Sequence, residues 1–474
     1  MGWHQTRRIA PWPIITCISN NFTETIVSSN TIFIPVTLGV AAIALAGGYY
    51  LGSRQAAPET QAETQQTSTA AATQQTLVHP DISTPDKTLM PNTTSLQSKI
   101  PQAQNPHASG QPSSPATNAL PPQSGQAHLH NKADPNAKFT HFRVGQRNVK
   151  RIMADGDVMW VGTSGGVIRY NIKTDDYKLY DSRNGLLANG VFHLSKMDGE
   201  IVVGTYGGGM SLLDEKTGKW RTYNIPQGLG DAFVYDVLKA DNGDIWIATW
   251  SGANRIRGGN LDNSSKWDLF TVENTNGGLP NDWVYGLAMG KSGEIWMATE
   301  GGLARFKDGK WDNWNHQDGQ GADYALVKDQ IQFTNDPADY SKHHTRQKSE
   351  MGLENVDVAY NPNYIVALLV DDDGSVWAGT WGGGLAHFDG NSWKNYTVKD
   401  GLPANHIFSL YKSNGKIWVG TSKGLALRND DGSFKVYTTA DGLFSDVVFS
   451  MATAEDGSAW IGSFGGVARI AKLQ

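Results

Sequence analysis

The 474-residue sequence is poor in cysteine and in charge, and each shortage excludes a class of protein. The single cysteine, Cys17, permits no internal disulfide, so stability must come from a large core rather than from covalent staples. Only 18% of the residues are charged and the formal net charge is −6, which excludes the basic face that nucleic-acid binding requires. No triad, paired-carboxylate spacing or metal motif stands out, so we expect no cofactor and no metal, and we name no catalytic residue.

Long hydrophobic runs are also scarce, with one exception at residues 31–52. This stretch of about 22 uncharged, mostly apolar residues is long enough to cross a bilayer. Arg7 and Arg8 precede it, so the positive-inside rule predicts that residues 1–30 form a short cytoplasmic segment. A cleaved signal peptide is the alternative, because Ala44-Leu45-Ala46 resembles a cleavage site. Both interpretations export the rest of the chain.

The next segment, residues 53–137, is rich in Gln, Thr, Ser, Pro and Ala and has few aromatic residues. Such a composition buries too little apolar surface to fold. We expect a disordered linker here, which lets the following domain stand away from a membrane.

The remainder of the chain is abundant in Gly and Trp, and these residues belong to an internal repeat. A short apolar strand ends seven times in Trp-x-Gly-Thr or a close variant, followed by one or two glycines. The copies lie roughly 41 to 50 residues apart, except for one gap of about 81, and a period in the forties with strand chemistry is typical of propeller blades. The copies begin at Trp160, Val202, Trp246, Trp296, Trp377, Trp418 and Trp460.

Two further signals keep phase with this anchor and predict four strands in each unit. A turn dipeptide such as Asp155-Gly156 or Asp198-Gly199 precedes each anchor, as two-residue hairpins require. An aromatic pair spaced i, i+3, such as Trp220 and Tyr223, follows six of the anchors. The seventh aromatic strand is missing at the C-terminal end and is found instead at Phe139-Thr-His-Phe142.

These patterns predict an all-β fold, a seven-bladed β-propeller over residues 138–474. The N-terminal strand completes the last blade and so closes the ring. The wide gap corresponds to an insertion at about residues 315–362, which is charged and is expected to be a lid or a partner-docking arm.

Candidate binding residues gather at one end of the predicted ring. The glycine turns and the crossovers between blades share this end, which we call the crossover end. Aromatic or acidic residues occupy the position after the anchor Thr or Ser in five repeats, and a further Trp lies at the mouth of an inner strand. These residues are Tyr206, Trp250, Glu300, Trp381, Phe464 and Trp283.

Polar residues at the mouths of the inner strands are open to two interpretations. Asn189, Asp231, Asp282, Asn405 and Asp446 follow Gly-Leu signals, and short polar side chains there commonly cap turns. A polar ring around the axis is the alternative.

Three residues near or within the inner strands complete the candidate site. His193 and Asp236 come from adjacent repeats and are expected to form a hydrogen-bonded pair in the channel, and His406 lies at the start of another inner strand.

The repeat resembles the two-component regulator propeller repeat, and the segment from Asp400-Gly-Leu-Pro-Ala-Asn405 to Leu425 is a close copy. The resemblance covers nearly all of residues 138–474. In that family such propellers are bacterial periplasmic sensor modules, often paired in front of a membrane span and a histidine kinase. This chain shows one propeller and no kinase, receiver or DNA-binding segment, and the family supplies no catalytic residues to transfer.

The resemblance therefore implies a single-pass protein of the bacterial inner membrane with its propeller in the periplasm. We expect a recognition module, a sensory accessory that binds a glycan, peptide or protein partner through the aromatic crossover end. Signalling would then pass to a separate protein. The alternative is a propeller enzyme, such as a polysaccharide or lactone lyase. Its acid, base and metal-binding groups would come from His193, Asp236, Glu300, His406 or Asp446.

Overall fold

The computed structural model describes residues 137–331, 339 and 342–471. The expectations for residues 1–30 and 31–52, and for all but the last residue of 53–137, fall outside the described residues. Within the described ranges, none of the helices has the length and apolar character needed to cross a bilayer.

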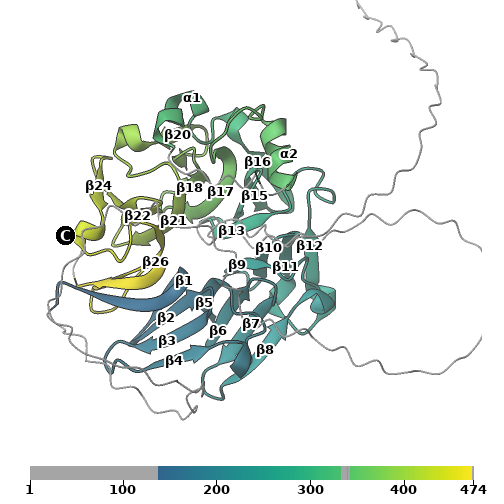
Figure 1. Cartoon of the computed structure of the whole chain (residues 1–474). Coiled ribbons are helices and arrows are strands. Elements are labelled where there is room, and N and C mark those ends of the chain that lie inside the picture. Colours follow the sequence, from purple (N-terminus) through teal and green to yellow (C-terminus); the bar gives the residue numbers. More distant parts are fainter. Residues whose placement is uncertain (1–136, 332–338, 340–341, 472–474) are drawn as a thin grey trace, which may run out of the picture.

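Antiparallel sheets surround a common centre, and the chain passes round this ring in order from β1 to β26 (Figure 1). Five of the sheets are separate four-stranded blades. Their strands are β5 (Val191–Met197), β6 (Glu200–Thr205), β7 (Met210–Asp214) and β8 (Lys219–Tyr223); β9 (Val234–Lys239), β10 (Ile245–Thr249), β11 (Gly252–Ile256) and β12 (Trp267–Phe270); β13 (Val284–Met289), β14 (Ile295–Thr299), β15 (Gly302–Lys307) and β16 (Lys310–Trp314); β17 (Asn361–Val370), β18 (Val376–Trp381), β19 (Leu385–Phe388) and β20 (Trp393–Tyr396); and β21 (Ile407–Ser413), β22 (Lys416–Thr421), β23 (Gly424–Arg428) and β24 (Phe434–Tyr437).

The remaining strands form one six-stranded sheet that contains both ends of the propeller. The expectation of a seven-bladed propeller is therefore wrong in its number of sheets: the described residues form five four-stranded blades and one six-stranded sheet. The physical reason is that β1 is a single long strand, which pairs with β26 at its start and with β2 at its end, so the first and last repeats share it. The strands of this sheet, in spatial order, are β25 (Val448–Thr453), β26 (Ala459–Ile470), β1 (Phe139–Asp155), β2 (Val158–Thr163), β3 (Gly166–Asn171) and β4 (Tyr177–Tyr180).

The first residues of β1 close the ring, as the sequence predicts. Phe139 pairs with Ile470 and Arg143 with Gly466, so a strand from the start of the propeller lies against its last strand. Phe142 also stacks on Trp460, with ring centroids 5.2 Å apart.

The anchor strands supply the packing between sheets. All six residues of β2 are buried, as are all five of β10 and of β14. Trp160, Trp246 and Trp460 expose no more than 2% of their surface. The anchor threonine has a local function, because its hydroxyl donates to the carbonyl of the turn glycine, as from Thr249 to Gly252 at 2.7 Å. The Trp-x-Gly-Thr pattern thus combines a blade-packing residue with a turn-fixing residue.

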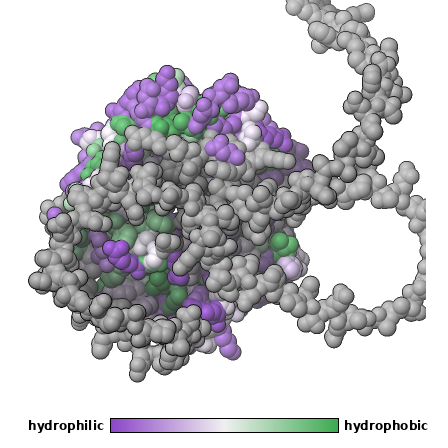
Figure 2. Space-filling model, viewed as in Figure 1, coloured by the Kyte–Doolittle hydropathy of each residue, from purple (hydrophilic) through white to green (hydrophobic). Residues whose placement is uncertain are grey.

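The insertion folds into two short helices, α1 (Tyr324–Val327) and α2 (Lys342–Glu350). The insertion has a small apolar cluster, which includes Val327, Ile331 and Tyr360. The Tyr360 hydroxyl donates to Ala322 O at 2.7 Å. Hydrophilic residues and some apolar ones, including the exposed Leu326, share the surface around α1 (Figure 2). The described part of the insertion thus has a small apolar core of its own.

Candidate functional site

The crossover end is assembled as the repeat pattern predicts, because each glycine turn is tied to the start of an inner strand. Tyr206 N donates to Gly190 O at 2.8 Å, and Trp250 N donates to Phe233 O at 3.3 Å. The same contact joins Glu300 N to Trp283 O at 3.2 Å.

Four aromatic rings on this end form a continuous belt. Tyr206 contacts Phe233 with ring centroids 4.5 Å apart, Phe233 contacts Trp250 at 4.8 Å, and Trp250 contacts Trp283 at 4.6 Å. The three contacts are edge-to-face, an arrangement in which rings attract each other. All four side chains are half-buried. The belt consequently keeps some surface for a ligand, although its rings already stabilise one another.

Helix α2 covers the next position along this end. The His344 ring lies 5.2 Å from that of Trp283, and its Nε2 lies 2.9 Å from Glu300 Oε1. Tyr285 donates its hydroxyl to Glu300 Oε2 at 3.3 Å. Glu300 is fully buried and His344 is 4% exposed. A carboxylate in this setting is held by its neighbours and is not offered to solvent.

Trp381 and His406 are also buried, which differs from the open rim that the sequence suggests. Trp381 is 1% exposed and stacks on Tyr364 and Phe408. His406 is 2% exposed, and its Nε2 lies 2.7 Å from Ala359 O at the end of the insertion. Burial lowers the pKa of His406 to about 4, so the ring is neutral at pH 7 and donates to that carbonyl. Both residues serve packing in this structure.

Phe464 lies apart from the belt, in the turn within β26. It pairs with Asn148 of β1 and is 37% exposed. Among the nine candidates it is the most exposed apolar side chain.

The polar residues at the strand mouths bond to backbone, as the turn-capping interpretation predicts. Each accepts from an N–H near its own crossover, as when Asp446 Oδ1 accepts from Thr439 N at 2.7 Å. Equivalent bonds reach Asn189 from Ser182 (2.7 Å), Asp231 from Phe233 (3.1 Å), Asp282 from Val272 (2.7 Å) and Asn405 from Val398 (3.0 Å).

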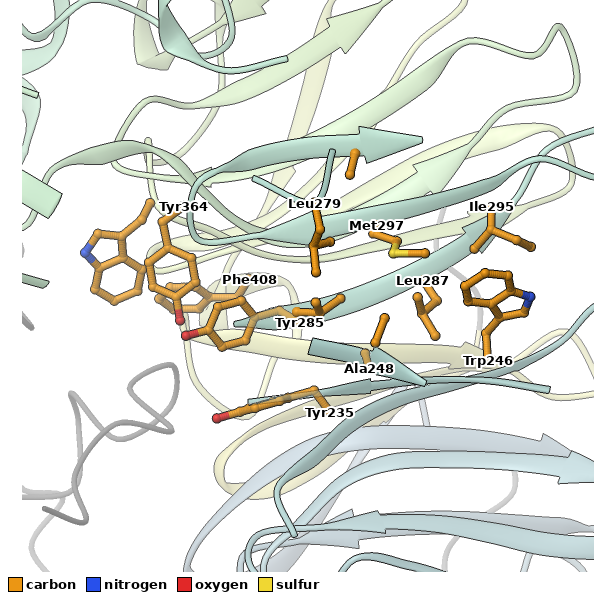
Figure 3. Close-up of a cluster of buried hydrophobic side chains, with 14 of the residues drawn as sticks. Tyr235, Trp246, Ala248, Leu279, Tyr285, Leu287, Ile295, Met297, Tyr364 and Phe408 are labelled. Carbon is orange, nitrogen blue, oxygen red and sulfur yellow. The ribbon is translucent and has the colours of Figure 1, made fainter. Parts of the chain in front are cut away.

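A cavity of about 310 Å³ lies on the axis, beneath the crossover end. The rings of Tyr235, Tyr285, Tyr364 and Phe408 gather at one end of a buried cluster (Figure 3). Those of Tyr235, Tyr285 and Phe408 also line the cavity. Lining residues come from inner strands all round the ring and include Lys150, Arg151, Phe192, Tyr235, Asp236, Tyr285, Phe408 and Phe449.

Two cations in this cavity were missed by sequence reasoning. Lys150 Nζ lies 3.9 Å from the centre of the Phe192 ring, a cation–π distance, and burial lowers the Lys150 pKa to about 7. Alignment of the repeats could have located Lys150, because it occupies the inner-strand position that Phe192, Tyr235 and Phe408 fill in other repeats. Arg151 likewise matches His193.

His193 and Asp236 meet across two blades, as expected. His193 Nδ1 lies 2.6 Å from Asp236 Oδ1, and Arg151 Nη2 approaches the same oxygen at 3.3 Å. Burial lowers the His193 pKa, although the hydrogen bond to Asp236 opposes this shift. Burial alone would raise the Asp236 pKa, but Arg151 and His193 together bring it below its ordinary value. The pair is therefore a neutral imidazole beside a carboxylate at pH 7.

Among the described residues, no group of three or more His, Cys, Asp or Glu side chains is arranged to hold a metal ion.

Comparison with known proteins identifies the repeats. The family model described as two component regulator propeller matches residues 359–382 and 401–423. A curated protein named histidine kinase P4, from Formosa agariphila, is 29% identical over 144 residues, which are 27% of this chain and 10% of that protein.

Solved structures agree in fold. The extracellular domain of a hybrid two-component system from B. thetaiotaomicron aligns with a TM-score of 0.53 and 21% identity, over 70% of this chain and 41% of that one. A second such domain from the same organism aligns with a TM-score of 0.50 and 17% identity, over 70% and 39% of the two chains. This chain thus spans less than half of each of these proteins. It is a β-propeller, and its residues 359–382 and 401–423 match the two component regulator propeller repeat.

Proposed function

We propose that this propeller is an exported recognition module that binds a glycan, peptide or partner protein at its crossover end and accompanies a separate signalling protein. The axial cavity is the observation that carries the proposal. Its volume of about 310 Å³ lies at the small end of the range of ligand sites, and a few charged groups converge there among aromatic rings.

The chemistry of the lining favours an acidic ligand with a ring. Arg151 is a cation, and Lys150, with its pKa of about 7, becomes one on binding an anion. Among the described residues of the lining, Asp236 is the one carboxylate, and it already accepts from Arg151 and Leu287 N. The belt of Tyr206, Phe233, Trp250 and Trp283 offers stacking faces above the cavity. An acidic oligosaccharide satisfies both features, with a carboxylate at Lys150 and a sugar face on the belt.

The test is binding of the full-length chain to an array of neutral and uronate-containing oligosaccharides, followed by calorimetry on the hits. Lys150→Met should weaken acidic ligands by about tenfold or more, because a charge-assisted hydrogen bond contributes about 1.5 to 3 kcal/mol. Trp250→Ala should weaken neutral and acidic ligands alike. Tyr177→Ala, at an exposed ring on the outer strand β4, is the matched control and should bind as wild type does.

The pH dependence gives a second readout. A bound anion favours the protonated form of Lys150, whose pKa is about 7, so the affinity of wild type for an acidic ligand should fall as pH rises from 6.5 to 8.5. The Lys150→Met variant should lose this dependence. Equal affinities of wild type, Lys150→Met and Trp250→Ala for every bound ligand would overturn the proposal.

A further inference from the structure

A second set of side chains on the axis has the arrangement of a nucleophile and its base. His193 and Ser195 lie two residues apart on β5, and Asp236 lies on β9 of the next blade. Ser195 Oγ is 2.8 Å from His193 Nε2, while His193 Nδ1 is 2.6 Å from Asp236 Oδ1. In hydrolases on unrelated folds, a serine is activated when its hydroxyl contacts Nε2 of a histidine and a carboxylate contacts Nδ1 of the same ring.

The carboxylate of this set is fixed in place. Asp236 Oδ2 accepts from Leu287 N at 2.9 Å, and Oδ1 also receives Arg151 Nη2 at 3.3 Å. An ionised Asp236 holds the proton of His193 on Nδ1, which leaves the lone pair of Nε2 directed at the Ser195 hydroxyl. Burial lowers the His193 pKa, so the imidazole is in its basic form at pH 7.

The hydroxyl also has space in front of it. Ser195 lines a second axial cavity of about 430 Å³, together with Arg151, Lys196, Ser409 and Tyr411. This cavity lies further along the inner strands than the one beneath the crossover end, and Arg151 and Ser409 line both. Arg151 therefore brings a guanidinium to the same space as the hydroxyl.

We propose that Ser195 is the nucleophile of a second site, which cleaves small esters by acyl transfer, with His193 as general base and Asp236 as its positioning residue. Ser195 Oγ forms a bond to the ester carbonyl carbon as His193 Nε2 takes the hydroxyl proton, and the carbonyl electron pair moves to oxygen. Arg151 stabilises this oxyanion. The bond from carbon to the leaving alkoxide then breaks, and the alkoxide receives the proton from Nε2. Water repeats the sequence on the acyl-enzyme and regenerates Ser195.

The test is covalent labelling of the full-length chain with an alkyl fluorophosphonate, mapped by mass spectrometry of intact protein and peptides. Wild type should gain one adduct at Ser195 when native and none when unfolded in urea. Release of p-nitrophenol from p-nitrophenyl acetate should show a burst of one equivalent, since an acyl-enzyme accumulates.

Variants then assign the roles. His193→Gln should slow labelling by about 100-fold or more, because general-base catalysis typically contributes about 10²- to 10⁴-fold. Asp236→Asn should slow it similarly by reversing the tautomer of His193. Ser409→Ala is the matched control, a serine of the same two cavities outside the His193 chain, and should label at the wild-type rate.

Two results would overturn the proposal. The first is native wild type that gains no adduct at Ser195, which does not depend on any variant folding. The second is labelling of Ser195 at an unchanged rate in a His193→Gln protein whose circular dichroism and melting match wild type. Neither result bears on ligand binding beneath the crossover end, so the two proposals fail separately.

Discussion

At the scale of single residues, two adjacent positions decide the chemistry of the axis, and they are the second and third residues of inner strands such as β5, β9 and β21. One position holds an aromatic ring in most repeats but Lys150 in the first, and the next holds Arg151, His193, Asp236 or Ser409. Sequence reasoning noticed His193 and Asp236 in this register and overlooked Lys150 and Arg151. Alignment of the repeats was sufficient to find all four of these residues, because residues at equivalent positions of the inner strands face the same axis.

His406 gives a prediction for acid stability. Its pKa is about 4 in the folded protein and about 6.5 when exposed, so the unfolded chain binds the proton first as pH falls. The stabilisation is therefore complete above pH 6.5, falls progressively below it and is lost once pH reaches 4. In urea unfolding, wild type should lose about 2 to 3 kcal/mol more than His406→Gln between pH 7 and pH 4.5. Parallel losses in the two proteins would show that His406 does not carry this acid sensitivity.

At the scale of elements, the strands were predictable and the insertion was not. Anchor, turn and aromatic signals all report local geometry, which the structure reproduces in β2, β10 and β14. The sequence suggested for the insertion either a lid or a docking arm. The structure shows that His344 is buried against Trp283 and Glu300. The repeat pattern could not predict this contact, because His344 lies outside the repeats.

Helix α2 yields a second prediction. His344→Ala removes the imidazole beside the buried Glu300 carboxylate, so the free energy of unfolding should fall by about 1 to 3 kcal/mol. Hydrogen exchange should accelerate in residues 342–350, and the belt should become more accessible to a quencher of tryptophan fluorescence. Arg346→Ala on the same helix is the control, since Arg346 pairs only with exposed Glu350 in the described contacts and should change neither readout. Unchanged exchange in His344→Ala would mean that other contacts hold α2.

At the scale of the whole molecule, stability depends on ring closure. The start of β1 pairs with β26 and its end pairs with β2, so one strand joins the first and last repeats. A solenoid tolerates the loss of a terminal strand because each repeat contacts only its neighbours, whereas a ring opened at one point loses an internal interface.

Deletion of residues 138–143 tests closure directly. The deletion removes the pairs from Phe139↔Ile470 to Arg143↔Gly466, and we expect the free energy of unfolding to fall by about 4 kcal/mol or more. A synthetic peptide of residues 137–145 should restore part of this loss, while a scrambled peptide should not. A deletion that melts at the wild-type temperature would show that the propeller does not need this strand.

The sequence by itself determined the propeller, the order of strands in each repeat and the strand that closes the ring. These features follow from local sequence motifs repeated at a fixed period. A motif that is weak evidence for a strand when it occurs once becomes specific when it recurs at the same spacing. Tertiary structure decided what the sequence left open: the first and last repeats share one long strand and form a six-stranded sheet, Glu300, Trp381 and His406 are buried, and Ser195 joins His193 and Asp236. Each of these depends on contacts between residues of different repeats or on side-chain placement within a strand, and such contacts are set by the closed ring rather than by any one repeat.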